Sequence, residues 1–94
     1  MKEYAVTNEM IRDLIQQLPN VFDSHDVIER IMQKHPQQYT MDLFSFVAKD
    51  DPIHSLHASI GQRLLGFDSI EKTEKVPSTN VRGNDTDNQE WRRK

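Results

Sequence analysis

Apolar side chains recur at helical spacing in four stretches of the first 66 residues. The first predicted helix, Asn8–Leu18, carries them on one face, and Thr7 stands before it as a suitable N-cap. The last, Pro52–Gly66, follows Asp51 as its cap and has proline in the first helical position, where the missing N–H costs nothing. Gly66 is placed to end this helix in a left-handed conformation. Most of the chain up to this glycine is therefore expected to be helical.

The two middle stretches predict further helices. Helix two begins at a cap formed by Asp23 or Ser24 and ends at His35, because Pro36 disfavours the helical conformation in the residue before it. A third helix is expected over Gln38–Lys49. Its apolar residues occupy much of the circumference, so we expect this helix to be well buried.

Beyond Phe67 the pattern changes from helical spacing to the alternation that is typical of a strand. Residues Ile70–Val81 are rich in β-branched side chains, which favour an extended backbone. Pro77 cannot donate a ladder hydrogen bond, so it indicates an edge strand or a bulge. The turn-forming residues of Gly83–Asn88 then predict a tight turn.

The segment after that turn, Gln89–Lys94, predicts a second strand that returns along the first. Trp91 offers a large apolar area within an otherwise polar segment, and we expect it to be at least partly buried against the hairpin or the last helix. The pattern leaves one alternative open, in which residues 78–94 form a disordered tail.

These elements predict a single α+β domain over residues 1–94, with three or four helices followed by a C-terminal β-hairpin. We expect flexibility at residues 1–6 and 92–94. In the order of its elements the chain resembles winged-helix domains, and that resemblance implies nucleic-acid binding. Periodicity places the core at Ile11, Leu14, Ile15, Leu18, Val27, Ile28, Ile31, Leu43, Phe46, Val47, Leu56, Ile60 and Leu64.

Net charge and its distribution bear on possible partners. The 94 residues carry a net charge of −3, which argues against strong non-specific binding to nucleic acid. Residues 1–51 hold five basic and nine acidic side chains, whereas residues 52–94 hold seven basic and six acidic ones. A surface that contacts DNA would therefore lie in the second half of the chain.

Composition also limits the class of protein. Cysteine is absent, which excludes disulfides and thiolate metal ligands. The first six residues lack the apolar stretch of a secretory signal, and no run approaches the roughly 20 apolar residues that cross a bilayer. We therefore expect a cytoplasmic protein that makes no membrane contact.

Two histidines raise the question of a metal site. His54 and His57 lie three residues apart on one predicted helix, and Asp50 and Asp51 precede them with further oxygen ligands. However, His57 falls within the apolar stripe, where a hydrogen-bonded core histidine is the commoner role. This interpretation favours a structural histidine over a metal ligand.

Catalytic patterns are equally weak. Ser24, His25 and Asp26 are the residue types of a catalytic triad, but consecutive helical residues point in different directions and cannot form one together. The sequence has no glycine-rich phosphate loop. We therefore expect a binding protein without a cofactor rather than an enzyme.

The candidate nucleic-acid contacts come from the last helix and the predicted hairpin. The outer face of Pro52–Gly66 would show polar side chains that suit base edges and phosphates, and the basic residues of the hairpin would contact the backbone as a wing does. Asp50 and Asp51 stand against this reading, because they would repel phosphate at the start of the helix. The candidate residues are Ser55, Ser59, Gln62, Arg63, Arg82, Arg92 and Arg93.

A second resemblance rests on segments that span about three quarters of the chain: Phe22–Ile28, Tyr39, Leu43, Leu56–Gly61, Ser78–Gly83 and Trp91. In these segments the chain resembles a small family of uncharacterised bacterial proteins, and this resemblance implies no activity. Two functions therefore stay open: a winged-helix module that binds duplex DNA, and an interaction or accessory module that binds another protein.

Overall fold

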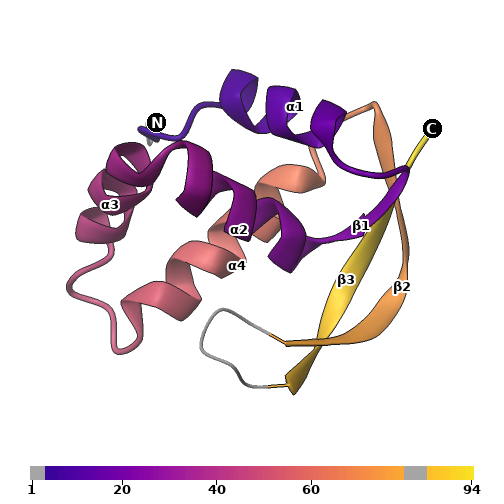
Figure 1. Cartoon of the computed structure of the whole chain (residues 1–94). Coiled ribbons are helices and arrows are strands. Elements are labelled where there is room, and N and C mark those ends of the chain that lie inside the picture. Colours follow the sequence, from indigo (N-terminus) through magenta and orange to yellow (C-terminus); the bar gives the residue numbers. More distant parts are fainter. Residues whose placement is uncertain (1–3, 80–84) are drawn as a thin grey trace.

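The computed structural model describes residues 4–79 and 85–94 of the chain. Within these ranges it has four α-helices and a three-stranded antiparallel sheet, which confirms the α+β class. Figure 1 shows α3 at one end of the molecule and the sheet at the other. In chain order the elements are α1 (Asn8–Gln17), β1 (Val21–Asp23), α2 (Ser24–Lys34), α3 (Pro36–Ser45), α4 (Pro52–Leu64), β2 (Ile70–Thr79) and β3 (Asp85–Arg93).

Side-chain caps define the beginnings of three helices. The Thr7 hydroxyl accepts the N–H of Met10 at 3.2 Å, as predicted for α1. At α2 the cap is Asp23, and a capping box forms because Asp23 and Asp26 each accept the other's backbone N–H at 2.9 Å. Asp51 caps α4 in the predicted manner.

Helix α3 covers Pro36–Ser45, so the predicted range Gln38–Lys49 is wrong at both ends. Proline opens the helix at its first position, where its fixed φ angle is already helical. At the other end the N–H of Phe46 donates to the carbonyl oxygen of Leu43, and this tighter turn ends the helix.

The prediction that the third helix is well buried is also wrong. Tyr39 and Phe46 are buried, but Met41, Phe44 and Val47 are 65%, 75% and 64% exposed. The main contacts of α3 are with α2 and α4, which cover one side of the helix and leave the other open. Val47, expected in the core, therefore lies on the surface.

Helix α4 ends without the predicted left-handed glycine. The N–H of Gly66 donates to the carbonyl oxygen of Arg63 at 3.1 Å, and Phe67 donates in the same way to Leu64 at 3.2 Å. The φ angle of Gly66 is not in the left-handed region. Right-handed turns with three-residue spacing thus satisfy the last carbonyl groups of α4.

The sheet contains one strand more than the predicted hairpin. Strand β1, between α1 and α2, pairs with β3, which gives the order β1-β3-β2. Phe22 of β1 stands opposite Trp91 of β3 in the antiparallel register. The last strand in the chain is therefore the central strand of the sheet.

The two predicted hairpin strands form, with shifted bounds. Strand β3 begins at Asp85, so the second part of the predicted turn Gly83–Asn88 is strand, while residues 80–84 lie outside the described residues. Pairing along β3 also rules out the alternative of a tail for its residues 85–93. Pro77 lies on an edge strand as predicted, whereas the irregularity in pairing falls between Lys72 and Lys75.

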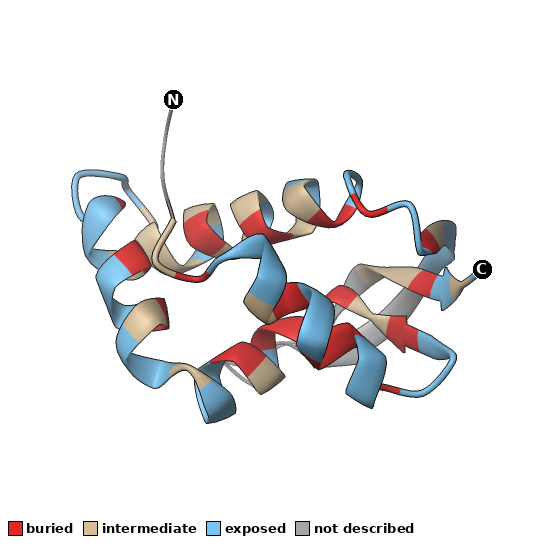
Figure 2. Ribbon diagram, turned by 90° about the horizontal axis from the view of Figure 1, so that it is seen from above, coloured by how far each residue is buried: buried red, intermediate tan, exposed pale blue. Residues whose placement is uncertain are grey.

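The core lies between the helices and the sheet, where buried residues face one another (Figure 2). Eleven of the 13 predicted core residues are buried, Leu43 is partly buried, and Val47 is exposed. The burial of Trp91 is confirmed, with its indole N–H donating to the hydroxyl of Ser24 in α2 at 2.9 Å. The buried apolar residues that the core prediction omits are Val6, Phe22, Tyr39, Phe67, Ile70 and Trp91.

The hydrogen bond between Trp91 and Ser24 should contribute measurably to stability, because both groups are buried. We expect Ser24→Ala and Trp91→Phe each to lower the free energy of unfolding, with a coupling energy of about 0.5–1.5 kcal/mol between them. Urea unfolding of the two single variants and the double variant measures this coupling. Additive effects would show that the two side chains contribute independently.

Candidate functional site

The N-terminal segment lies against two of the residues proposed to read nucleic acid. The hydroxyl groups of Tyr4 and Ser59 are 2.9 Å apart, within hydrogen-bonding distance. The Arg63 guanidinium lies 4.2 Å from the centre of the Tyr4 ring, and its Nη2 donates to the carbonyl oxygen of Val6 at 2.7 Å and to Asn8 Oδ1 at 2.8 Å. Ser59 and Arg63 therefore hold the chain's own N-terminal segment.

A buried carboxylate on α3 also holds this segment. Asp42 is only 5% exposed, and its two oxygens accept the N–H groups of Ala5 at 2.7 Å and Val6 at 3.0 Å. Val6 is part of the core. Residues 1–6 are expected to be flexible, and within that range these hydrogen bonds link residues 5 and 6 to α3. We call Asp42, Ser59 and Arg63 the N-terminal clamp.

The clamp keeps a charged guanidinium in a partly desolvated position. Burial lowers the pKa of Arg63 from its ordinary value, while Tyr4 and the Asp42 carboxylate act in the opposite direction. An arginine stays protonated under these conditions. Its Nε and Nη2 donate to protein oxygens, whereas its Nη1 is buried without a hydrogen-bond partner among the described residues. The contacts of Nε and Nη2 make Arg63 a structural residue in this conformation.

The other α4 candidates differ in their exposure. Gln62 faces solvent, as do His54 and Ala58, whereas Ser55 is half-buried. Because exposed positions repeat every four residues, the open face of α4 runs through residues 54, 58 and 62. Gln62 is thus exposed, whereas Ser59 and Arg63, which the sequence interpretation places on the same face, contact the N-terminal segment.

The hairpin arginines also contact protein groups. Arg92 of β3 stands opposite Glu71 of β2, and its Nη2 approaches Glu71 Oε1 to 2.6 Å. The hydrogen bond from Arg92 lowers the pKa of Glu71 below its ordinary value, and the charge of Arg92 adds to this effect. Arg82 lies outside the described residues.

Arg93 stabilises the end of a helix. Its Nη2 donates to the carbonyl oxygen of Leu18 at 2.7 Å and also to that of Ile15. These carbonyls belong to the C-terminal end of α1, whose last turn has no basic residue of its own. Arg93 therefore supplies the positive charge and the donors that a helix C-terminus favours.

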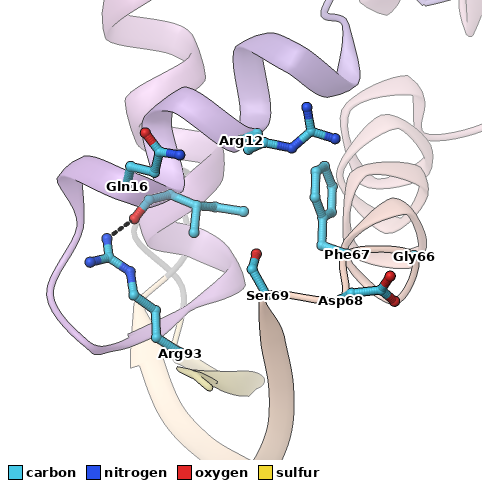
Figure 3. A pocket seen from close by; sticks show the side chains of 8 residues that line it. Arg12, Gln16, Gly66, Phe67, Asp68, Ser69 and Arg93 are labelled. Carbon is cyan, nitrogen blue, oxygen red and sulfur yellow. Dashed lines mark hydrogen bonds between the residues drawn. The ribbon is translucent and has the colours of Figure 1, made fainter.

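A pocket of about 460 Å³ lies where α1 meets the start of β2 (Figure 3). Arg12 extends over the ring of Phe67, with its guanidinium carbon 5.8 Å from the ring centre, and Arg93 approaches α1 from the other side. Asp68 belongs to the same lining. The two arginines would suit an anionic ligand, but one is engaged with α1 and a carboxylate shares the lining.

The histidine proposed to be structural has a partner in the core. Nε2 of His57 lies 2.8 Å from the hydroxyl oxygen of Tyr39, which joins α4 to α3. The side chains described for the chain include no cluster of three His, Asp or Glu residues able to hold a metal ion. His57 thus contributes to the contact between the two helices.

A further surface, which the sequence analysis placed in the interior, lies on and just after α3. Met41, Phe44 and Val47 follow one another at intervals of three residues and are each more than half exposed. We call these three residues the α3 surface. The feature of the sequence that could have indicated this surface is the low charge of the region, since Asp42 is the only charged residue from position 36 to position 48.

Comparison of the chain with protein-family models, with curated proteins and with solved structures found no match. Among the helices that the structure describes, none has the length and apolar character needed to cross a membrane.

The N-terminal clamp predicts a specific loss of stability. Asp42→Asn places an amide where two backbone N–H groups need an acceptor, and we expect it to lower the free energy of unfolding by about 1–3 kcal/mol. Amide exchange at Ala5 and Val6 should accelerate as well. Asp50→Asn, at an exposed position, is the matched control and should change neither quantity. Equal effects of the two variants would contradict the role assigned to the clamp.

The ion pair on the sheet predicts a pH dependence. Because the pKa of Glu71 is lowered on folding, its contribution is complete above the ordinary value of about 4.5 and is lost as the pH falls through the folded value. The Tm difference between the native protein and Glu71→Gln should therefore be constant near neutral pH and should shrink below pH 4.5. Glu74→Gln on the same strand serves as the control. A difference that grows in acid would contradict the assignment.

Proposed function

We propose that this protein is a small winged-helix-like binding module that acts by contacting another protein through the α3 surface. The observation that carries the proposal is the exposure of Met41, Phe44 and Val47 on a stretch without exposed charge. Large apolar side chains exposed so close together in the sequence are a feature of interaction sites. Methionine and phenylalanine are also enriched in the cores of protein interfaces.

The position of the surface supports this role. Helix α3 packs on α2 and α4, and Tyr39 together with Phe46, which follows the helix, is buried, so the fold holds the exposed side chains in place. A partner that covers them would not need to reorganise the fold, which lowers the entropic cost of binding. The partner implied by this chemistry is a protein surface with apolar groups and little charge.

The arginines support a protein partner over a phosphate backbone. Arg63 is engaged with the N-terminal segment, Arg92 with Glu71, and Arg93 with the end of α1. Using them on DNA would require these contacts to be given up, and the net charge of −3 adds a long-range repulsion. We further propose, as the sequence patterns predict, a binding role rather than catalysis, in a cytoplasmic protein.

Nucleic-acid binding is the second candidate function, and the arrangement of elements favours it. Helix α4 precedes the β2–β3 hairpin, which is the order of a winged-helix domain, with α3 as an additional helix between α2 and α4. The exposed Lys72 and Lys75 lie on β2. In this alternative the hairpin would contact backbone phosphates and Gln62 would face a groove.

Two measurements on the intact protein distinguish the functions. Titration with mixed-sequence duplex DNA should show no binding even at about 50 mM salt. Low salt is the condition under which a weakly basic surface binds DNA most readily. Binding with a log–log salt slope of about −3 to −4, reduced by Arg92→Ala, would overturn the proposal in favour of the second candidate.

The positive test uses a photo-crosslinking amino acid at position 44 in living cells. We expect a discrete protein adduct there, its loss when Met41 and Val47 are both replaced by serine, and none from the same probe at exposed position 75. Equal adducts at both positions, or none at position 44, would contradict a docking role for the α3 surface.

A further inference from the structure

The pocket between α1 and the start of β2 has properties of a ligand site that is separate from the α3 surface. Its volume of about 460 Å³ falls within the roughly 300–1,000 Å³ of small-molecule sites. The buried side chains of Ile15 and Phe67 supply its apolar lining. Polar side chains from α1, from the connection between α4 and β2 and from β3 also line it, namely Arg12, Gln16, Ser69 and Arg93. Segments far apart in the sequence thus build one small pocket.

Most hydrogen-bond donors of this pocket are not used by the protein. Arg93 binds the end of α1 through Nη2, and its Nε and Nη1 donate to no described residue. Arg12 lies over the ring of Phe67 and likewise donates no hydrogen bond within the described part of the chain. The same holds there for the Gln16 amide and the Ser69 hydroxyl. Figure 3 shows this hydroxyl pointing towards α1, the helix that carries Arg12 and Gln16.

The charge of the lining suits an anion with a single charge. Two arginines and Asp68 give it a net charge of +1, in a chain whose overall net charge is −3. In Figure 3 the Asp68 carboxylate points away from Arg12, Ser69 and Arg93, so it does not compete for their donors. Among the described residues, no carboxylate forms an ion pair with either guanidinium. A basic pocket of this kind attracts an anion from solution.

We propose that this pocket binds a small monocarboxylate. The two oxygens of a planar carboxylate match the paired N–H groups of a guanidinium. Its single charge balances that of the lining, whereas a phosphate ester carries about −1.5 to −2 at neutral pH. The Ser69 hydroxyl supplies a further donor, and Ile15 and Phe67 contact the apolar body of the ligand. Because Arg12, Gln16 and Ser69 are exposed, we expect a dissociation constant on the order of 1 mM.

Titration of the isotope-labelled full chain with benzoate, followed by NMR of its amide groups, is the test. Benzoate should shift the amide signals of Gly66, Phe67 and Ser69 along saturable curves. Benzamide, a neutral analogue of nearly the same shape, and inorganic phosphate should each bind at least about tenfold more weakly. No saturable shift by about 10 mM benzoate, or equal binding of benzamide or phosphate, would overturn the proposal.

A matched pair of variants locates the site. Arg12→Gln removes one guanidinium and should weaken benzoate binding about tenfold, with a Tm close to that of the native protein. Lys34→Gln removes another exposed positive charge, from α2, and should leave the affinity unchanged because Lys34 does not line the pocket. Equal affinities of the native protein and Arg12→Gln, or equal losses in both variants, would overturn the proposal. Circular dichroism verifies each fold, and if Arg12→Gln unfolds, the comparison of benzoate with benzamide on the native protein still decides.

Discussion

The structure depends on the pairing of β3 with both β1 and β2, which places Trp91 in the core. This one strand links segments that are far apart in the sequence, because its residues pair with Phe22, which precedes α2, and with Ile70, which follows α4. Trp91 adds a buried hydrogen bond to α2 through Ser24, and Arg93 adds donors for the end of α1. The nine residues of β3 thus hold four elements in place, namely β1, β2, α1 and α2.

The sequence predicts the helices well because their signals are local. Thr7, Asp23 and Asp51 cap helices within three residues of their partners, and such contacts are specified by short stretches of chain. Strand β1 has only three residues and exists because β3 pairs with it from about 70 residues away, which no local pattern records. The exposure of Phe44 is a similar case, since periodicity identifies an apolar position but not whether a partner element covers it.

The candidate site shows the same contrast between local signals, which the sequence reveals, and contacts between distant residues, which it does not. Composition identifies the basic residues, but the function of each depends on which oxygen lies within reach in the fold. Arg63 meets a backbone carbonyl 57 positions earlier in the chain, and Arg93 meets one 75 positions earlier. The sequence therefore indicates which residues carry positive charge. It does not indicate that these residues form hydrogen bonds with other groups of the same chain. Only the neutrality of positions 36–48 was available in advance as a sign of the α3 surface.

The central place of β3 also bears on how the protein is made. During translation α1, α2, α3 and α4 leave the ribosome before the strand that closes the sheet has been synthesised. Until then β1 has no neighbour, the indole that fills the space beside Ser24 is missing, and the end of α1 lacks its arginine. The nascent chain must therefore keep its apolar helix faces out of contact with other chains for most of its synthesis, and native packing becomes possible only after β3 has emerged.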